Sequence, residues 1–583
     1  MSRRRFMGGT IACTAVATTA AVSSAPFAAL AQTAPAGTDI IFRGGKVYTQ
    51  NPAQPWAEAL AVSGKTISAV GSNADIDKLK GAGTKVVELN GRLVMPGFVE
   101  GHIHPFLGSF LTAGVDLQVP TREEALAAIA RFAKENPKGT IRGFGWRVDM
   151  FPPEGPTRQD LDKIIPDRPA FFIAIDGHSL WANSKALEMA KVDKDTPDPI
   201  PRFSYYVRDE KGYPTGYVLE VNAVLAVVNA IEPISLTALG GLMEAWLPKA
   251  AAAGITSIFD AGVPPIGSDQ ATILNVYVDA EKRGRLPFRV VGSCIVKSPP
   301  IDDAVQQIQD IRKKVSSELV QVNFVKIIGD GTQEGYTAWL VEPYSDKPDF
   351  SGASPFSEEE WAKLVGMTDA AGFDVHIHAC GDRTARVALD AIEKAIKANP
   401  PRERRHSIAH LVYVTDQDIP RFAKLGVNSQ FSANWFSADP DTSEILKDRY
   451  GERQKKLYRV ASTLKSGGRV SFGTDWPAAG YFSTYKPLDS IQIAVTRQLI
   501  GKATNPVLGP EEERLTLVQA VHASTMGGAH QIRMEDKIGS LEAGKLADLV
   551  VLEKNIFEGS VHDIAHTKID LTLMNGKVTH GSV

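Results

Sequence analysis

Cysteine is scarce in this chain, whose 583 residues include three. Cys13 lies in an N-terminal leader, and Cys294 and Cys380 stand far apart in the sequence. Two remote cysteines do not form the dense disulfide framework of small secreted domains. Both lie in apolar, strand-like stretches, and the sequence therefore predicts that they are buried, inert thiols.

A strong charge of either sign is also absent, and no apolar run beyond the leader is long enough to span a membrane. The formal net charge is −3, which gives no indication of a nucleic-acid groove or an anionic membrane surface. We therefore expect a small-molecule substrate, no nucleic-acid partner and no stable membrane association. The sequence allows a homo-oligomer but does not predict one.

Residues 1–31 have the pattern of a secretory signal peptide. Arg3 and Arg4 lie in a charged start, small and apolar residues follow, and Ala29-Leu30-Ala31 forms an A-x-A cleavage site. The paired arginines followed by Phe6 resemble the twin-arginine signature, which exports folded proteins. We expect a periplasmic or secreted protein. An uncleaved membrane anchor fits less well, because the leader is rich in Ala and Thr and only weakly apolar.

Strand-like segments occur at both ends of the chain. Residues 32–96 and 534–583 alternate short apolar runs with turns, which predicts one small β-sandwich domain assembled from both ends. Two separate β domains would each have too few strands to build a core. Between them, residues 97–533 alternate apolar runs with helical patterns, which is typical of a parallel sheet in an α/β fold.

The central region offers eight candidate strands, the number expected of a (β/α)₈ TIM barrel. They are residues 97–102, 255–260, 289–294, 323–328, 374–378, 406–410, 427–431 and 470–473. A long insertion at about 105–250 follows the first strand and is expected over the barrel mouth. Within it, Gly145-Trp146 and Asp176-Gly177-His178 resemble loop material. A second insertion covers residues 330–356.

Polar residues recur where these strands end, and in (β/α)₈ enzymes that edge carries the active site. His102 and His104 stand at positions i and i+2, so both imidazoles point to the same side of a strand and can reach one ion. Neutral imidazole suits Zn²⁺ and similar ions. A single histidine at a strand end is more often structural than a ligand, and only the joint pattern favours a metal site.

Lys326 lies inside the apolar run 324–328, where burying a charged amine is costly. Burial lowers the pKa of a lysine, and the neutral amine can react with CO₂ to give a carbamate that bridges two cations. The alternative is an edge-strand lysine whose amine extends to solvent.

Three further strand ends offer metal ligands. His376 and His378 end one strand, His406 and His410 flank another, and we take His378 and His410 because they lie nearer the carboxyl ends. Asp475 follows the last strand and suits both metal binding and the acceptance of a proton from bound water.

The order and spacing of these residues resemble the amidohydrolase superfamily. Met95-Pro96-Gly97-Phe98 at the start of the barrel and residues 539–549 at its end match as well. More narrowly, residues 176–184, 381–383 and 473–477 resemble the amidohydrolase-3 (YtcJ-like) branch, which includes N-substituted formamide deformylases.

The resemblance implies a hydrolase that cleaves an amide-like, non-peptide carbon–nitrogen bond of a small molecule through a metal-activated hydroxide. It implies one or two divalent ions of the zinc type, a carboxylated Lys326 as a bridge, and Asp475 as the catalytic proton carrier. The implied metal ligands are His102, His104, Lys326, His378, His410 and Asp475. A metal-dependent lyase or isomerase would use the same ligands. A non-catalytic periplasmic binding protein would not need the complete set.

Four residues are candidates for the substrate pocket: Trp146, His178, Arg383 and Trp476. Arg383 either pairs with a substrate carboxylate or braces Asp382. His178 and the two tryptophans either contact the substrate or pack the loops.

The leader generates a prediction about export. Replacing Arg3 and Arg4 together by lysine should trap the precursor in the cytoplasm, because the two arginines are the feature that the export route reads. Cell fractionation followed by immunoblotting measures this. Normal appearance of the mature form in the periplasm would refute the twin-arginine interpretation.

Overall fold

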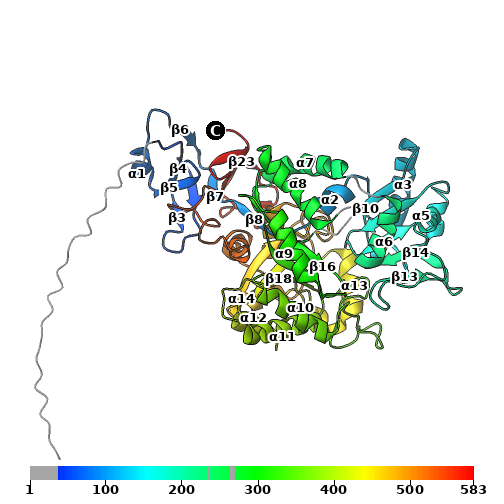
Figure 1. The fold of residues 1–583 in the computed structure, drawn as a ribbon. Helices are drawn as coiled ribbons and strands as arrows, with labels where there is room; N and C mark the ends of the chain where they lie inside the picture. Colours follow the sequence, from blue (N-terminus) through cyan, green and yellow to red (C-terminus); the bar gives the residue numbers. More distant parts are fainter. Residues whose placement is uncertain (1–36, 233–235, 263–268) are drawn as a thin grey trace, which may run out of the picture.

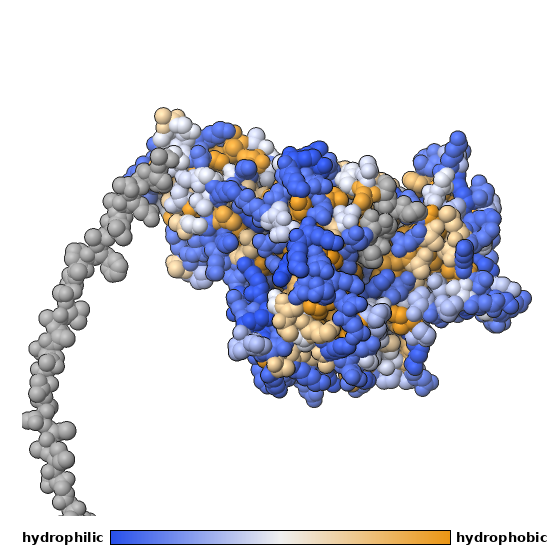
Figure 2. Space-filling view, viewed as in Figure 1, coloured by the Kyte–Doolittle hydropathy of each residue, from blue (hydrophilic) through white to orange (hydrophobic). Residues whose placement is uncertain are grey.

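The computed structural model describes residues 37–232, 236–262 and 269–583. The predicted signal peptide, with Arg3, Arg4 and Cys13, lies outside the described residues, so export stays a prediction. Figure 1 shows the N-terminal and C-terminal strands side by side at one end of the molecule and the long insertion at the opposite end. Most of the face in Figure 2 is hydrophilic, with hydrophobic residues in small separate patches.

Eight parallel strands form the central sheet, in the order β21-β20-β19-β18-β17-β16-β15-β8. They are β8 (Phe98–Ile103), β15 (Ile255–Asp260), β16 (Arg289–Val296), β17 (Val320–Ile328), β18 (Asp374–Ala379), β19 (Ser407–His410), β20 (Asn428–Ser432) and β21 (Arg469–Gly473). Each overlaps one of the eight predicted strands, and the predicted α/β barrel fold is confirmed. The strands are almost entirely buried, which explains why they appear in the sequence as apolar runs.

At their carboxyl ends, β8 and β21 meet and bring the two edges of the sheet together. The backbone N–H of Asp475 donates to the carbonyl of His102 over 2.8 Å, and that of His104 donates to Trp476 over 2.9 Å. The carboxylate of Glu100 accepts from the backbone N–H of Thr474 over 2.6 Å. The approach is so close that a Cβ on Gly473 would lie 2.3 Å from the backbone nitrogen of His102.

Helices follow most strands and pack around the sheet. They include α8 (Gln270–Lys282), α9 (Ala304–Lys314), α10 (Glu358–Ala370), α11 (Asp382–Ala398), α12 (Ile419–Leu425), α14 (Val460–Lys465), α15 (Pro487–Thr496), α16 (Leu517–His522) and α17 (Gly528–Gln531). α10 begins at a capping box formed by Ser357 and Glu360, which satisfies backbone donors at the helix start. α11 buries Ala385, Ala388 and Ile392, three residues spaced along one helical face.

The long insertion contains a second sheet with its own apolar core. Its strand order is β13-β14-β12-β11-β10-β9, and the strands are β9 (Val115–Asp116), β10 (Ile141–Trp146), β11 (Ala170–Ala174), β12 (Ser179–Ala182), β13 (Tyr205–Arg208) and β14 (Pro214–Leu219). Helices α3 (Arg122–Glu135), α4 (Arg158–Asp162) and α5 (Ser184–Met189) accompany it. Gly145 and Trp146, expected in a loop, are in strand β10, whereas Asp176 and His178 do lie in a turn.

Three helices connect the insertion with the barrel: α2 (Pro105–Leu111), α6 (Val221–Ile231) and α7 (Leu236–Ala252). In the described segments no single helix is long and apolar enough to cross a membrane, although α6 and α7 pass that test together, with a bend of 114° between them.

Two small sheets contain the strands from both chain ends. One has the order β5-β4-β1-β6 and the other β24-β23-β22-β7-β2-β3. Their strands are β1 (Ile40–Arg43), β2 (Lys46–Tyr48), β3 (Trp56–Ala57), β4 (Ala59–Ser63), β5 (Thr66–Gly71), β6 (Lys85–Glu88), β7 (Leu93–Pro96), β22 (Leu549–Leu552), β23 (Ile569–Met574) and β24 (Lys577–His580). β7 pairs antiparallel with β22, and one apolar cluster contains residues of both sheets. The two ends of the chain therefore build one core, and its status as a separate sandwich domain stays a prediction.

Both described cysteines, Cys294 and Cys380, are buried and not in a disulfide, as the sequence predicts. Burial raises the pKa of each thiol, which keeps them protonated and poorly nucleophilic at neutral pH.

The close approach of β8 and β21 generates a stability prediction. Gly473→Ala should destabilise the protein by about 3 kcal/mol, because its Cβ would overlap the backbone of His102 and neither strand can retreat cheaply. Gly366→Ala in α10 is the control, since its Cβ would meet nothing within 4 Å; it should add roughly 0.5–1 kcal/mol of stability. Urea unfolding measures both, and equal midpoints for the two variants would contradict the account.

Candidate metal centre

Asp475, which follows the last strand of the barrel, lies among histidines from the end of the first strand and from the sixth strand. One carboxylate oxygen, Oδ1, lies 3.2 Å from Nε2 of His102 and 3.3 Å from Nε2 of His104. The other, Oδ2, lies 3.7 Å from Nδ1 of His410. One ligand atom each from His102, His410 and Asp475 fall within 4.8 Å of one another, and all three residues are buried. This spacing is compatible with a single cation between them.

The backbone at two of these residues is strained. His410 has φ = 74° and Asp475 has φ = 59°, in the left-handed region that non-glycine residues rarely adopt. Each such residue costs of order 1–3 kcal/mol, and such strain concentrates at functional sites. His410 is the last residue of β19, and Asp475 stands two residues after the end of β21.

Burial favours the neutral form of three of the histidines, His102, His378 and His410. Burial, reinforced by the charge of Lys326, lowers the pKa of His102 well below its ordinary value. Burial likewise lowers the pKa of His378 and of His410. A neutral imidazole keeps a free lone pair on one nitrogen, which is the form that binds a divalent metal.

His410 carries the clearest indication that something else binds here. Its ring stacks on Trp435 at a centroid distance of 4.9 Å, and its Nδ1 lies 3.0 Å from the hydroxyl of Ser432. Its Nε2 is buried and has no hydrogen-bond partner among the described residues. Leaving such an atom unsatisfied costs about 1–3 kcal/mol, a cost that a cation at this position would remove. The residues present therefore fit a bound metal.

Lys326 lies at the centre of the same cluster. Its side chain is buried, with Nζ 3.4 Å from Nε2 of His102. Burial lowers the pKa of Lys326 to about 8, even though Asp475 acts in the opposite direction. With this pKa, part of the Lys326 amine is neutral at physiological pH, and the neutral amine is the form that the expected carbamate chemistry requires.

The two histidines of β18 occupy different positions. Nε2 of His376 lies 2.8 Å from Nδ1 of His102, and its own Nδ1 lies 2.6 Å from the hydroxyl of Ser407. His376 therefore contacts a ligand candidate and not Asp475. The ring of His378 lies 4.4 Å from that of His410, and its Nε2 forms a second compact group with Asp330 and Cys380.

Residues that the sequence did not single out orient this cluster. The side-chain carbonyl oxygen of Gln430 lies 3.1 Å from Nδ1 of His102. Asp330 accepts hydrogen bonds from the backbone N–H groups of Cys380, Gly381 and Trp339. Glu100 is buried, and burial raises its pKa to about 8. Strand alternation could have indicated Glu100, because it stands two residues before His102; Gln430 and Asp330 carry no comparable signal.

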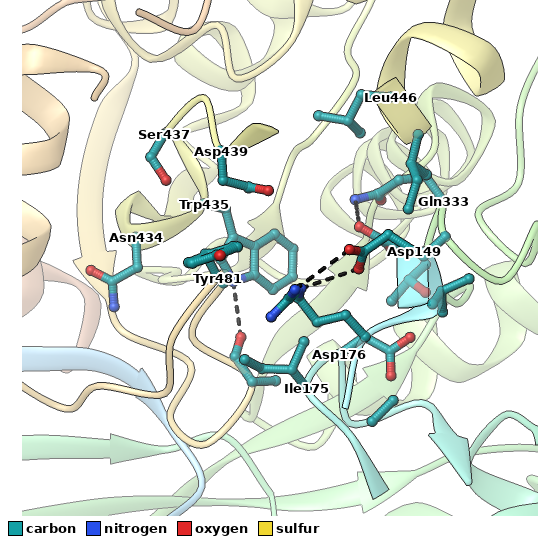
Figure 3. A pocket seen from close by; sticks show the side chains of 18 of the residues that line it. Asp149, Ile175, Asp176, Gln333, Asn434, Trp435, Ser437, Asp439, Leu446 and Tyr481 are labelled. Atoms are coloured by element: carbon teal, nitrogen blue, oxygen red, sulfur yellow. Dashed lines mark hydrogen bonds and ion pairs between the residues drawn. The ribbon is translucent and has the colours of Figure 1, made fainter. Parts of the chain in front are cut away.

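A cavity at the carboxyl edge of the barrel lies next to the cluster, and we call it the mouth cavity. Trp435 lines this cavity and also stacks on His410, so it forms the boundary between them. Figure 3 shows side chains from the insertion, the segment after β17 and the segments after β20 and β21 around it. The cavity therefore adjoins the cluster, with Trp435 between the two.

The four predicted pocket residues lie in different environments. Trp146 lines the mouth cavity, yet its side chain is fully buried in the core of the insertion. His178 lies with its ring 5.1 Å from that of His378 and its Nδ1 2.7 Å from Glu220. Trp476 stacks on Trp246 at 5.2 Å, away from the cavity lining.

Arg383 lies away from the cluster around Asp475. Its guanidinium lies over the ring of Trp339 and donates to Glu358, on the outer side of α11. It does not line the mouth cavity, and its guanidinium bonds to Glu358 while the carboxylate of Asp382 accepts from the backbone of Val341.

The family model of the amidohydrolase family (Amidohydro_3) matches residues 85–580 of the chain. The putative amidohydrolase YtcJ of Bacillus subtilis is 28% identical over 93% of this chain and 99% of its own. The N-substituted formamide deformylase of Arthrobacter pascens is 27% identical over 92% of this chain and 97% of its own. A solved structure, an uncharacterized metal-dependent hydrolase from Pyrococcus furiosus, has a TM-score of 0.65 at 26% identity and covers 88% of this chain and 99% of its own.

The geometry predicts that two neighbouring histidines differ in their effect on metal binding. His102→Ala should abolish metal binding, because Nε2 of His102 is a direct ligand candidate. His376→Ala should weaken affinity by roughly 10–100-fold, as expected when only a partner of a ligand is lost. Competition with a chromogenic chelator measures both, and His580→Ala in β24 is the control. A larger loss in His376→Ala than in His102→Ala would show that the ligand assignment is wrong.

Proposed function

The chain belongs to the amidohydrolase family, and from that premise we propose that it hydrolyses an amide-like, non-peptide carbon–nitrogen bond of a small molecule. The observation that carries the proposal is the buried group of neutral histidines, Lys326 and Asp475 beside the mouth cavity. We further propose that the metal is of the zinc type, because the set is rich in imidazole nitrogen with one carboxylate. The comparison proteins include a deformylase of N-substituted formamides, which supports the proposed bond type.

His102, His410 and Asp475 would hold the metal, with His104 next to the same carboxylate oxygen of Asp475. His378 and Lys326 stand beside this group and would complete the site if a second ion binds. A bound divalent cation would lower the pKa of water and polarise the substrate carbonyl. The other steps depend on the chain's own groups.

Asp475 is suited to carry the proton. Burial alone would raise its pKa, but His410, a hydrogen bond from His104 and the charge of Lys326 outweigh burial and lower it. The carboxylate is therefore ionised at neutral pH and can accept a proton from the attacking water at one oxygen. When the oxygen of water bonds to the carbonyl carbon and the C–N bond breaks, Asp475 delivers that proton to the leaving nitrogen.

The proposal is tested with purified protein loaded with Zn²⁺ and offered N-acyl amines, N-acyl amino acids, lactams and cyclic imides. We expect hydrolysis of at least one class, loss of activity after chelation, and recovery on adding metal back. Protein that binds no divalent metal, or metal-loaded protein that cleaves none of the four classes, would overturn the proposal.

Two substitutions separate metal binding from chemistry. Asp475→Asn keeps one oxygen ligand but removes the group that accepts the proton, so it should retain most of the metal and lose roughly 10²–10⁴ in kcat. Lys326→Ala should lose metal as well as rate if a carbamate bridges two ions, and short carboxylic acids should partly restore both. Metal analysis and steady-state kinetics measure these effects. Full activity of Lys326→Ala would exclude the bridge and leave a site for one metal.

A further inference from the structure

The mouth cavity is rich in carboxylates. Among the described residues that line it, Asp149, Asp176, Glu334 and Asp439 are acidic, whereas Arg147 is the single basic residue. Nε of Arg147 pairs with Oδ1 of Asp149 over 3.1 Å. The lining therefore contains more acidic than basic side chains.

Two neighbouring side chains after β17 present hydrogen-bond acceptors in this cavity. The amide nitrogen of Gln333 donates to Glu334 over 2.7 Å. This leaves the carbonyl oxygen of Gln333 without a partner among the described residues, although the side chain is 3% exposed. A buried, unsatisfied acceptor that lines a cavity indicates that a donor group of a ligand binds there.

Glu334 and Asp176 repel one another across the same space. Burial, and then the charge of Asp176, raises the pKa of Glu334 to about 7. Burial also raises the pKa of Asp176, whose Oδ1 is held by backbone N–H groups of the turn at His178 and Ser179. A cation between the two carboxylates would reverse this repulsion and favour their charged forms.

The remaining walls are apolar and aromatic. Ile175, Ile445, Leu446 and Ala478 line the cavity, and Trp435 separates it from His410. This lining suits a short hydrocarbon segment that leads from the acidic wall toward the metal ligands, and an aromatic face nearby further favours a cation.

We propose that the mouth cavity selects substrates with an ammonium group, which the carbonyl of Gln333 and the carboxylates of Glu334 and Asp176 bind, joined by a short apolar chain to the scissile amide. The position of the scissile bond rests on the proposed function. The binding of the ammonium group does not, since it depends only on residues outside the metal centre.

Binding of n-pentylammonium tests the cation site without any reaction. Isothermal titration calorimetry at pH 8, where both Glu334 and the amine are charged, compares this probe with the neutral n-pentanol. We expect the protein to prefer the ammonium probe, and Glu334→Gln to weaken its binding by roughly tenfold to hundredfold, the loss typical of a hydrogen bond to a charged group. The variant should bind n-pentanol as the original protein does.

The matched control is Glu342→Gln, which removes the same charge from an exposed position on the same segment and should leave both affinities unchanged. Asp176→Asn provides a second variant with a smaller expected loss, should Glu334→Gln fold poorly. No preference for the ammonium probe, or equal binding by Glu334→Gln and Glu342→Gln, overturns the cation site.

Kinetics on the zinc-loaded enzyme connects this site with catalysis. N-acyl amines with a terminal ammonium group should have a higher kcat/KM than neutral analogues of equal length, and Glu334→Gln should remove the difference. If only neutral amides are cleaved, the ammonium proposal fails and the proposed hydrolysis stands. If the ammonium probe binds through Glu334 but no amide is cleaved, the proposed hydrolysis fails and the cation site stands.

Discussion

The contact between β8 and β21 is the constraint on which the site depends. Backbone hydrogen bonds join Asp475 to His102 and His104 to Trp476, residues more than three hundred positions apart in the chain. Without this closure, the imidazoles at the end of the first strand would not meet the carboxylate that follows the last strand. Gly473 permits the contact because any side chain there would overlap the backbone of His102. The closed sheet thus sets the distances between these histidines and Asp475, which no local stretch of chain could set.

Burial then determines the chemistry of the converging groups. Taking a charge out of water costs several kcal/mol per ion, and the histidines avoid this cost by remaining neutral. The same effect lowers the pKa of Lys326 to about 8. The pKa of Asp475 is lowered because its interactions with His410, His104 and Lys326 outweigh burial. One apolar environment therefore yields neutral ligands, a reactive amine and an ionised carboxylate. Nε2 of His410, which has no hydrogen-bond partner among the described residues, is the ligand atom that a further group could contact.

The sequence predicted the barrel well because buried parallel strands are apolar runs that end in polar residues. It predicted the insertion poorly: β10 contains two glycines, and Trp146 was expected in a loop although it belongs to the core of a second sheet. The sequence favoured His378 over His376 only because His378 lies nearer the carboxyl end of the strand. Strand alternation sends both to the same side, and their different contacts appear only in the fold. The position of Arg383 depends on the orientation of α11. Asp176 and Glu334 come from segments far apart in the chain, and only the fold brings both to the mouth cavity.

Anomalous diffraction at the zinc edge tests the central claim most directly, namely that the cluster around Asp475, where β8 meets β21, is a metal site. Crystals of zinc-loaded protein should show a peak bounded by His102, His410 and Asp475, with Nε2 of His410 facing the ion. A second peak near Lys326 and His378 would identify a two-metal centre. Protein that contains zinc at another position, with Nε2 of His410 bonded to water or to another residue, would contradict the account.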